Sequence, residues 1–366
     1  MKDPIRIALI GAGSISGAHR WAMEKHPRQI VLAGVTDPVL AAAEAFATPF
    51  GAPSFTDPVA MLDGLKGKVD AVVVTTPHFL HFQHAALAIE RGLPVLVEKP
   101  VVCTMAELRH LQALERKHGA FVQAGQMQRF GQEENWIKTW LESDEFGEPR
   151  LFNLDIYQNI EGYISKKADP WLLDKKAAGG GVVISVAIHI LDLLRYWFED
   201  DFIEVTAQGR YDAPMKNGAE SCCVAVLKTR RGMLGTLNCS YTVARCPYSQ
   251  RSLLFGTHGT LSQHQEVGGG AAGPYYISTD GGQPSPEWNM MYADFKPVRA
   301  RMEAIPGFVR EDNIEAFGRQ MLTFADAVRD RAPRENSLAR NLNTIAVIEA
   351  IGRSMASGKT EHVEIQ

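Results

Sequence analysis

The sequence predicts an α/β protein in two parts: an N-terminal doubly wound parallel sheet and a C-terminal α+β domain with a large, mostly antiparallel open sheet. In the first third of the chain, short runs rich in β-branched residues alternate with longer segments of helical apolar spacing. That order is typical of parallel strands joined by crossover helices. Beyond about Arg129, apolar runs follow one another with one long helical segment among them, which favours antiparallel pairing.

The first part is expected to cover residues 1–126. Its buried strands are predicted from short apolar runs at 5–10, 30–36, 69–75, 94–97 and 121–124. Helices are predicted at 79–91 and 105–118, where apolar residues recur with helical spacing. Because strand–helix–strand units in one sheet cross over in parallel, these strands should form a single parallel sheet.

The second part is expected to cover residues 127–366. Its strands are predicted at 150–158, 202–211, 222–228, 233–241 and 252–255. A strongly apolar helix at 182–198 follows Gly179-Gly180-Gly181 and should pack against the sheet beside the first domain. The glycine-rich stretch 268–282 predicts an irregular loop, and the chain should end with helices at 313–331 and 338–355 and a strand at 362–365.

Composition narrows the possible classes of function. The 366 residues are 45% hydrophobic and 22% charged, and the chain is too long for one comfortable core, so two domains are expected. A net charge of −4 gives no broad basic field, so neither nucleic acid nor a membrane surface is an expected partner. Five cysteines without CxxC spacing predict reduced thiols in a cytoplasmic protein and no metal site. No signal peptide or spanning segment is expected.

A glycine-rich turn follows the first predicted strand and precedes a helix. It reads Gly11-Ala12-Gly13-Ser14-Ile15-Ser16, and this is the place of a dinucleotide phosphate loop. Gly11 permits the tight turn, and Gly13 lets the backbone approach a pyrophosphate at the helix N-terminus. Ser16 occupies the third glycine position, so a turn without a ligand remains the alternative interpretation.

An aspartate ends the second predicted strand, within Val35-Thr36-Asp37. A carboxylate at this position can accept hydrogen bonds from both adenosine ribose hydroxyls. A 2′-phosphate would meet like charge there, so NAD is favoured over NADP. The alternative is that Asp37 is a turn residue before Pro38.

Together with motifs further along, these features resemble the glucose-fructose oxidoreductase / inositol dehydrogenase family, often called Gfo/Idh/MocA, over nearly the whole chain. The motifs are Gly11-x-Gly13 with His19, then Thr75-Thr76-Pro77 with His81, Ala85, Leu87 and Gly92, then Glu98-Lys99-Pro100, and finally Gly179-Gly180-Gly181 with His189 and Asp192. Glu98-Lys99-Pro100 is the most specific, and it follows a strand at the sheet edge where ligands of open α/β folds bind.

The resemblance implies a Rossmann domain, an NAD(P)-dependent oxidoreductase and a homodimer or homotetramer. The residues that it implies for coenzyme binding are Gly11, Ala12, Gly13, Ser14, Ile15, Asp37, Thr75, Thr76, Pro77, His81, Glu98 and Lys99.

Lys99 and His189 are the catalytic residues that the resemblance implies. Lys99 would reach the substrate hydroxyl beside the nicotinamide, and a lowered pKa would let it assist proton removal. His189 would accept the hydroxyl proton as hydride leaves. The alternatives are an exposed lysine at a strand end and a histidine satisfied within a core.

The expected substrate contacts include one departure from the family. Many relatives have an aspartate four residues before the histidine, one helical turn away, where this chain has Ser185, which can hydrogen-bond a hydroxyl but is not a base. Tyr157 and Trp171 are expected to present aromatic walls to a sugar ring, with core packing as the alternative. Arg129 is expected to anchor the domain junction, with a substrate contact as the alternative. Asp192 is expected either to orient the His189 ring or to have a structural role.

Three functions are compatible with these features. The leading one is reversible oxidation of a secondary alcohol on a sugar, inositol or related polyol, with hydride passing to NAD. The second is redox-neutral, NAD-dependent glycoside cleavage. The third is a non-catalytic NAD(P)-sensing regulator, since a protein that lost its catalytic role could replace the family aspartate with a residue such as Ser185.

Overall fold

The computed structural model describes residues 3–160, 170–243, 248–267, 276–279, 296–297, 313–330 and 335–365. The chain folds as two compact units. Unit 1 comprises Met1–Gly131, Ala177–Gly179 and Glu311–Ile345, and unit 2 comprises Gln132–Lys176, Gly180–Arg310 and Ala346–Gln366. The domain boundary expected after residue 126 falls just before the end of the first segment of unit 1, which also takes in residues from near the C-terminus.

Unit 1 contains a six-stranded sheet in the order β3-β2-β1-β4-β5-β6, and every pairing in it is parallel. The strands are β1 Ile5–Ile10, β2 Ile30–Thr36, β3 Ser54–Phe55, β4 Ala71–Val74, β5 Val95–Glu98 and β6 Val122–Gly125. The predicted parallel sheet is confirmed. Its central strands are buried along their length, which explains their unbroken apolar runs. The two-residue strand β3 is too short to give a sequence signal.

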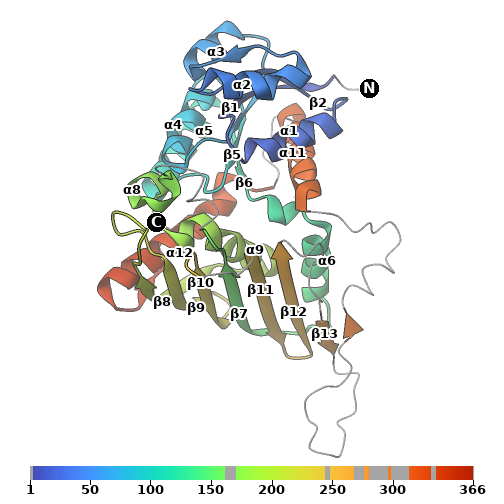
Figure 1. Ribbon diagram of the computed structural model, residues 1–366. Coiled ribbons are helices and arrows are strands. Elements are labelled where there is room, and N and C mark those ends of the chain that lie inside the picture. Colours follow the sequence, from blue (N-terminus) through green and yellow to red (C-terminus); the bar gives the residue numbers. More distant parts are fainter. Residues whose placement is uncertain are drawn as a thin grey trace, which may run out of the picture. The chain divides into compact units, whose positions relative to one another are not determined.

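The helices of unit 1 are α1 Ser16–Lys25, α2 Leu40–Ala47, α3 Pro58–Gly64, α4 His81–Ile89, α5 Met105–His118 and α11 Asn313–Asp330, with short turns η1 Thr48–Phe50, η2 His78–Leu80 and η3 Met127–Phe130. The ends of α5 match the prediction because its stop signals are strong. Thr104 and Glu107 form a reciprocal capping box, and Gly119 ends the helix in the left-handed conformation. Helix α11 packs beside α1 although some 290 residues separate them (Figure 1).

Unit 2 contains a nine-stranded sheet in the order β14-β13-β12-β11-β7-β10-β9-β8-β15 (Figure 1). The strands are β7 Pro149–Tyr157, β8 Phe202–Arg210, β9 Cys222–Thr229, β10 Leu234–Ser240, β11 Tyr248–Gly256, β12 Gly259–Val267, β13 Tyr276–Thr279, β14 Lys296–Pro297 and β15 Glu361–His362. Only β7 and β10 pair in parallel among these described strands. The predicted large, mostly antiparallel sheet is therefore confirmed.

Two expectations about unit 2 are wrong in detail. Strand β13 lies inside the stretch 268–282 for which an irregular loop is predicted, because flanking glycines hide a four-residue strand. The other residues of that stretch lie outside the described residues. Strand β12 is absent from the prediction because its sequence is largely polar, and it pairs with β11 along nearly its full length.

The helices assigned wholly to unit 2 are α6 Gln132–Leu141 and α9 Ile188–Phe198, while α8 Lys175–Ala178 and α12 Leu338–Ser357 each have residues in both units. The predicted helix at 182–198 is present, but its first part is a π-helix, η5 Val183–Ala187. By length and apolar composition alone, the helical stretch Lys175–Phe198 could cross a membrane, which differs from the expectation of no such stretch. Because 83% of its most apolar part is buried, as in a core helix, this is weak evidence for a span.

Alternate side chains of the unit 2 sheet lie on opposite faces. One face is buried and includes Ala225, Leu237 and Leu154, which face one another across β9, β10 and β7. The opposite face exposes large apolar side chains at Leu151, Val224, Val226 and Leu234. The sheet therefore has a core face and an open, partly apolar face.

A carboxyl group lies inside the core of unit 2. Glu134 of α6 is buried, and its Oε1 accepts a hydrogen bond of 3.0 Å from Gln263 Nε2 of β12. Burial raises the pKa of Glu134 to about 8, the negative charge of Glu133 adds to the shift, and the hydrogen bond from Gln263 opposes it. The carboxyl is thus neutral in the folded protein near pH 7.

Replacing Glu134 should therefore change how stability depends on pH. The folded protein holds the Glu134 proton up to about pH 8, whereas an unfolded chain loses it near pH 4.5. The free energy of unfolding should fall as pH rises through this interval. Glu134→Gln should remove that loss, which is about 5 kcal/mol for a pKa raised from 4.5 to about 8, and so raise the melting temperature at about pH 8.5 by several degrees, with little effect at about pH 5. Thermal melts at both values test this, with the exposed Glu142→Gln as control. Equal melting temperatures of Glu134→Gln and wild type at alkaline pH would contradict it.

Candidate active site

The turn after β1 has the backbone that a phosphate loop requires. Gly11 has a φ of +99°, and a Cβ there would lie 2.8 Å from Thr76 Cγ2 and 3.0 Å from the Thr75 carbonyl, so only glycine fits. A Cβ on Gly13 would meet nothing within 4 Å, so the backbone is open on that side. Gly13, Ser14 and Ile15 are exposed at the start of α1, and no side chain caps this helix N-terminus. This end of α1 can receive a pyrophosphate.

Ser16 explains why the third glycine position can differ. Its side chain is buried, and its Oγ donates a hydrogen bond of 2.6 Å to the carbonyl of Gly13. The serine therefore stabilises the turn on its buried side, and its side chain does not cover the exposed side of the loop.

Asp37 lies directly beside this loop at the end of β2. Its Oδ2 accepts a hydrogen bond from the Ala12 N–H at 2.9 Å, and its Oδ1 accepts one from Val39 N–H at 2.9 Å. The side chain remains partly exposed, and each carboxylate oxygen has a further lone pair for a hydroxyl donor. The structure thus gives Asp37 a turn-forming role as well as a position suited to ribose.

The turn after β4 connects to the phosphate loop. Thr75 is buried, and its Oγ1 donates to the carbonyl of Gly11, which ties β4 to β1. Thr76 and Pro77 are partly exposed at the carboxyl end of β4. His81 is fully buried at the start of α4, and its two ring nitrogens contact the carbonyls of Thr76 and Pro100. Of these expected coenzyme residues, Thr75 and His81 use their polar side-chain atoms on the protein's own backbone.

Lys99 follows β5 on the same edge of the sheet. Its neighbour Glu98 is buried, and Glu98 Oε1 lies 2.7 Å from Nε2 of His19, a buried residue of α1. Glu98 Oε2 accepts a hydrogen bond from the Lys99 N–H. Lys99 itself is half-buried. Burial lowers the pKa of its ammonium to about 8, with the charge of Glu98 opposing the shift.

Unit 1 therefore gathers the phosphate loop, Asp37, the Thr75-Thr76-Pro77 turn and Lys99 at the carboxyl edge of one parallel sheet. This is the place where open α/β sheets bind ligands. A lysine with a pKa near 8 can exchange a proton close to neutral pH.

In unit 2, Ser185, His189 and Asp192 lie along one helical stretch. Ser185 is buried within the π-helix, His189 is half-buried, and Asp192 is buried. The N–H of Ile188 bonds to the carbonyl of Val183, five residues back. The wider turn changes the expected register, so Ser185 and His189 are not related by one regular α-helical turn.

Glu220 is a structural residue of this region that sequence reasoning missed. Its buried carboxylate accepts hydrogen bonds from the N–H groups of Gly181 and Val183, at 2.9 and 3.0 Å, and thereby caps the helical stretch. A Cβ on Gly181 would lie 1.9 Å from the Glu220 carbonyl. Glycine is thus needed at position 181, where the chain passes the Glu220 backbone, and no sequence signal links residues so far apart.

The remaining predicted substrate residues lie in both units. Tyr157 ends β7 and Trp171 begins η4 Trp171–Leu173, and both side chains are half-buried in unit 2. Arg129 lies in η3 of unit 1 and is buried.

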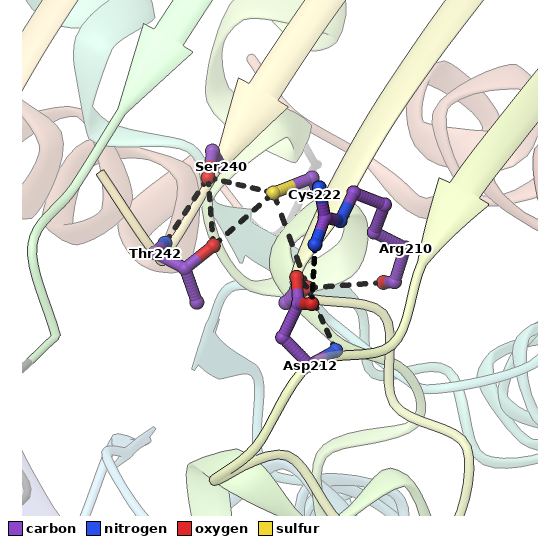
Figure 2. Close-up of polar contacts among 6 residues, drawn as sticks. Arg210, Asp212, Cys222, Ser240 and Thr242 are labelled. Atoms are coloured by element: carbon purple, nitrogen blue, oxygen red, sulfur yellow. Dashed lines mark hydrogen bonds and ion pairs between the residues drawn. The ribbon is translucent and has the colours of Figure 1, made fainter.

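A polar cluster surrounds one cysteine at the ends of β8, β9 and β10 (Figure 2). Cys222 Sγ lies 2.9 Å from Ser240 Oγ and 3.2 Å from Thr242 Oγ1, while Asp212 forms an ion pair with Arg210 and accepts a hydrogen bond from Ser221.

Cys103, Cys222, Cys223 and Cys239 are free thiols. Within the described residues, no three His, Cys, Asp or Glu side chains are arranged to hold a metal.

Comparison with known proteins places the chain among NAD-binding oxidoreductases. Residues 5–126 match the family model described as "Oxidoreductase family, NAD-binding Rossmann fold", and residues 135–262 match "GFO/IDH/MocA C-terminal domain". The chain belongs to the Gfo/Idh/MocA family.

Its curated relatives are distant. Glucose-6-phosphate 3-dehydrogenase of Bacillus subtilis is 27% identical over 58% of this chain and 59% of the relative, and D-glucoside 3-dehydrogenase of Escherichia coli is 30% identical over 53% and 54%. The chain thus spans little more than half of each. The scyllo-inositol 2-dehydrogenase (NAD(+)) of Bacillus subtilis is 26% identical over 73% of this chain and 77% of that protein.

Solved structures share the fold over its full length. An oxidoreductase domain protein from Kribbella flavida has a TM-score of 0.86 at 22% identity, covering 99% of this chain and all of the other. A levoglucosan dehydrogenase in complex with NADH has a TM-score of 0.83 at 18% identity, with coverage of 99% and 100%.

The position of Asp37 leads to a test of coenzyme choice. Asp37→Ser should weaken NADH binding about 10- to 100-fold, the loss expected for hydrogen bonds to a charged group. The same change should weaken NADPH binding less or improve it, because the charge that repels a 2′-phosphate is gone. Fluorescence titration with both coenzymes measures the ratio, and Asp63→Ser, on α3, is the control. An unchanged ratio of NADH affinity to NADPH affinity would show that Asp37 does not contact the adenosine ribose.

Proposed function

We propose that this protein is an NAD-dependent oxidoreductase that transfers a hydride between the nicotinamide and a secondary alcohol of a sugar, inositol or related polyol. Lys99 and His189 handle the proton. The observation that carries this proposal is Lys99, half-buried at the sheet edge with a pKa near 8, in the same unit as an open phosphate loop. Relatives named as dehydrogenases of glucose 6-phosphate and scyllo-inositol support the substrate class.

The residues of unit 1 fit a bound NAD. The open backbone at Gly13 and the uncapped start of α1 would hold the pyrophosphate, with Ala12, Ser14 and Ile15 completing the loop. Asp37 would hold the adenosine ribose, and Thr76, Pro77 and Glu98 would line the path toward Lys99. When bound, the nicotinamide supplies the hydride acceptor.

Proton transfer is the chemical task of this chain's own residues. The neutral Lys99 amine can accept the hydroxyl proton, or as ammonium can stabilise a developing alkoxide. His189 can take or pass on the same proton as neutral imidazole. Ser185, Arg129, Tyr157 and Trp171 would orient the substrate, since hydroxyl and guanidinium groups suit a polyol rim and aromatic faces suit its apolar surface.

Removing the Lys99 amine tests this function. Lys99→Ala should lower kcat for alcohol oxidation about 10²- to 10⁴-fold, the usual range for lost acid–base catalysis, while NADH still binds. Wild-type oxidation should increase as pH rises through about 8, where the amine loses its proton. Nicotinamide absorbance with inositols, aldoses, uronic acids and glycosides gives both readouts, and the exposed Lys66→Ala is the control.

Full turnover by Lys99→Ala would refute the assignment. A flat absorbance trace despite NADH binding would instead favour redox-neutral glycoside cleavage or a coenzyme sensor, for which Ser185 in place of a carboxylate is the suggestive feature. Product analysis of the glycoside reactions separates these two.

We also propose that the open face of the unit 2 sheet binds a second copy of this chain. Val224 and Val226 of β9, Leu234 of β10 and Leu151 of β7 lie on that face, each about half exposed. Leu234 and Leu151 are direct cross-strand neighbours, so the apolar surface is continuous there. Exposed apolar surface on a sheet favours self-association in a closed, symmetric oligomer.

A charge on this face should separate the copies. Val226→Glu should reduce the mass measured by light scattering to that of one chain, because the carboxylate would be buried without a partner. Val59→Glu, at an exposed site on α3, should leave the mass unchanged. A wild-type protein of monomer mass would refute the proposal.

A further inference from the structure

His81 contacts two loops at once. Its Nδ1 lies 2.6 Å from the carbonyl oxygen of Pro100, and its Nε2 lies 2.7 Å from that of Thr76. Pro100 directly follows Lys99 beyond β5, and Thr76 lies in the turn beyond β4. The imidazole, at 0% exposure, therefore bridges the two turns that border the candidate coenzyme site of unit 1.

The chemistry of these contacts depends on protons. A carbonyl oxygen only accepts hydrogen bonds, whereas a neutral imidazole has one N–H donor and an imidazolium has two. Both contacts are hydrogen bonds only when the ring carries both protons. A neutral ring donates to one carbonyl and turns a lone pair toward the other.

Charged and titratable groups around the ring act in opposite directions. Burial lowers the pKa of His81 below its ordinary value, the positive charge of Lys99 adds to this, and the two carbonyls and Glu98 oppose it. His78 of η2 has its ring centroid 5.7 Å away, and its pKa is lowered by burial. Burial also lowers the pKa of His84, on α4, to about 4. Near neutral pH the two neighbouring histidines are uncharged.

Lys99 is thus held from both sides by buried histidines of different helices. On its N-terminal side, Glu98 is held by His19 of α1. On its C-terminal side, Pro100 is held by His81 of α4. The His19–Glu98 contact needs only one ring N–H, because the Glu98 carboxylate is the acceptor. His81, by contrast, can donate to both carbonyls only when its ring carries a second proton.

We propose that His81 is a positioning residue for Lys99: at the alkaline pH where the Lys99 amine acts, its neutral ring lies between the Pro100 and Thr76 carbonyls and donates to one of them, and uptake of a proton on acidification completes both hydrogen bonds. The role of Lys99 that it serves rests on the proposed oxidoreductase function. The bridge itself is a property of unit 1 alone and needs neither coenzyme nor substrate.

Nitrogen NMR of the full-length protein with ¹⁵N-labelled histidine tests the bridge directly. His81 resonances are those lost in His81→Gln. On acidification from about pH 8 to about pH 5, they should change from one protonated ring nitrogen to two. Protection factors of the amides in peptides spanning Thr76 and Pro100, which correct for the general slowing of exchange in acid, should rise in the wild type and not in His81→Gln. A ring that keeps a single proton throughout, or protection factors that change equally in both proteins, would overturn the proposal.

Kinetics separate positioning from general folding. His81→Gln should lower kcat about 10- to 100-fold, the effect of misplacing a reacting group, with a smaller change in KM and an altered acidic limb of the pH profile. The exposed His362→Gln is the control. An unchanged pH profile and kcat in His81→Gln would refute the role. If Lys99→Ala is fully active while the NMR result holds, the proposed function fails and the bridge stands.

Discussion

The contact between His19 and Glu98 is the interaction on which the candidate site depends. A carboxylate buried without a partner costs several kcal/mol, and here a histidine from α1 lies 2.7 Å away with both side chains almost wholly enclosed. This pair joins the helix that begins at the phosphate loop to β5, the strand that directly precedes Lys99. Glu98 also receives the Lys99 N–H, so one carboxylate sets the course of the backbone there.

Close backbone approach is the second constraint, and glycine meets it in both units. Gly11 lies against Thr75 and Thr76, Gly125 would place a Cβ 2.9 Å from Glu98 Cα, and Gly181 lies against Glu220. In unit 1 these approaches bring the ends of β1, β4, β5 and β6 to one edge. In unit 2 the approach starts the helical stretch that carries Ser185 and His189. The positions of the functional side chains thus follow from backbone packing as much as from their own contacts.

Much of the fold could be predicted because its signals are local. Strands β1 and β2 were recognisable from unbroken apolar runs, and α5 from its capping residues. Strand β13, flanked by glycines, and the π-helix could not be, since Val183–Ala187 is a sequence that an α-helix would also accept. Of the site, the positions of Gly11, Asp37 and Lys99 follow from motifs. The contacts of Glu98 with His19, of Gly181 with Glu220 and of His81 with Pro100 join residues that are 79, 39 and 19 positions apart, so these tertiary contacts are not predictable from local sequence.

The pairing of α11 with α1 bears on how the protein is made. Met321, Phe324 and Ala325 of α11 share a core cluster with Ile5, Leu9 and other residues near the N-terminus. During synthesis, domains generally fold in the order in which they leave the ribosome. Here the first sheet emerges long before the helix that completes its core. The nascent unit 1 must therefore expose part of its apolar surface until α11 has been synthesised, and chaperones would have most to protect during that interval.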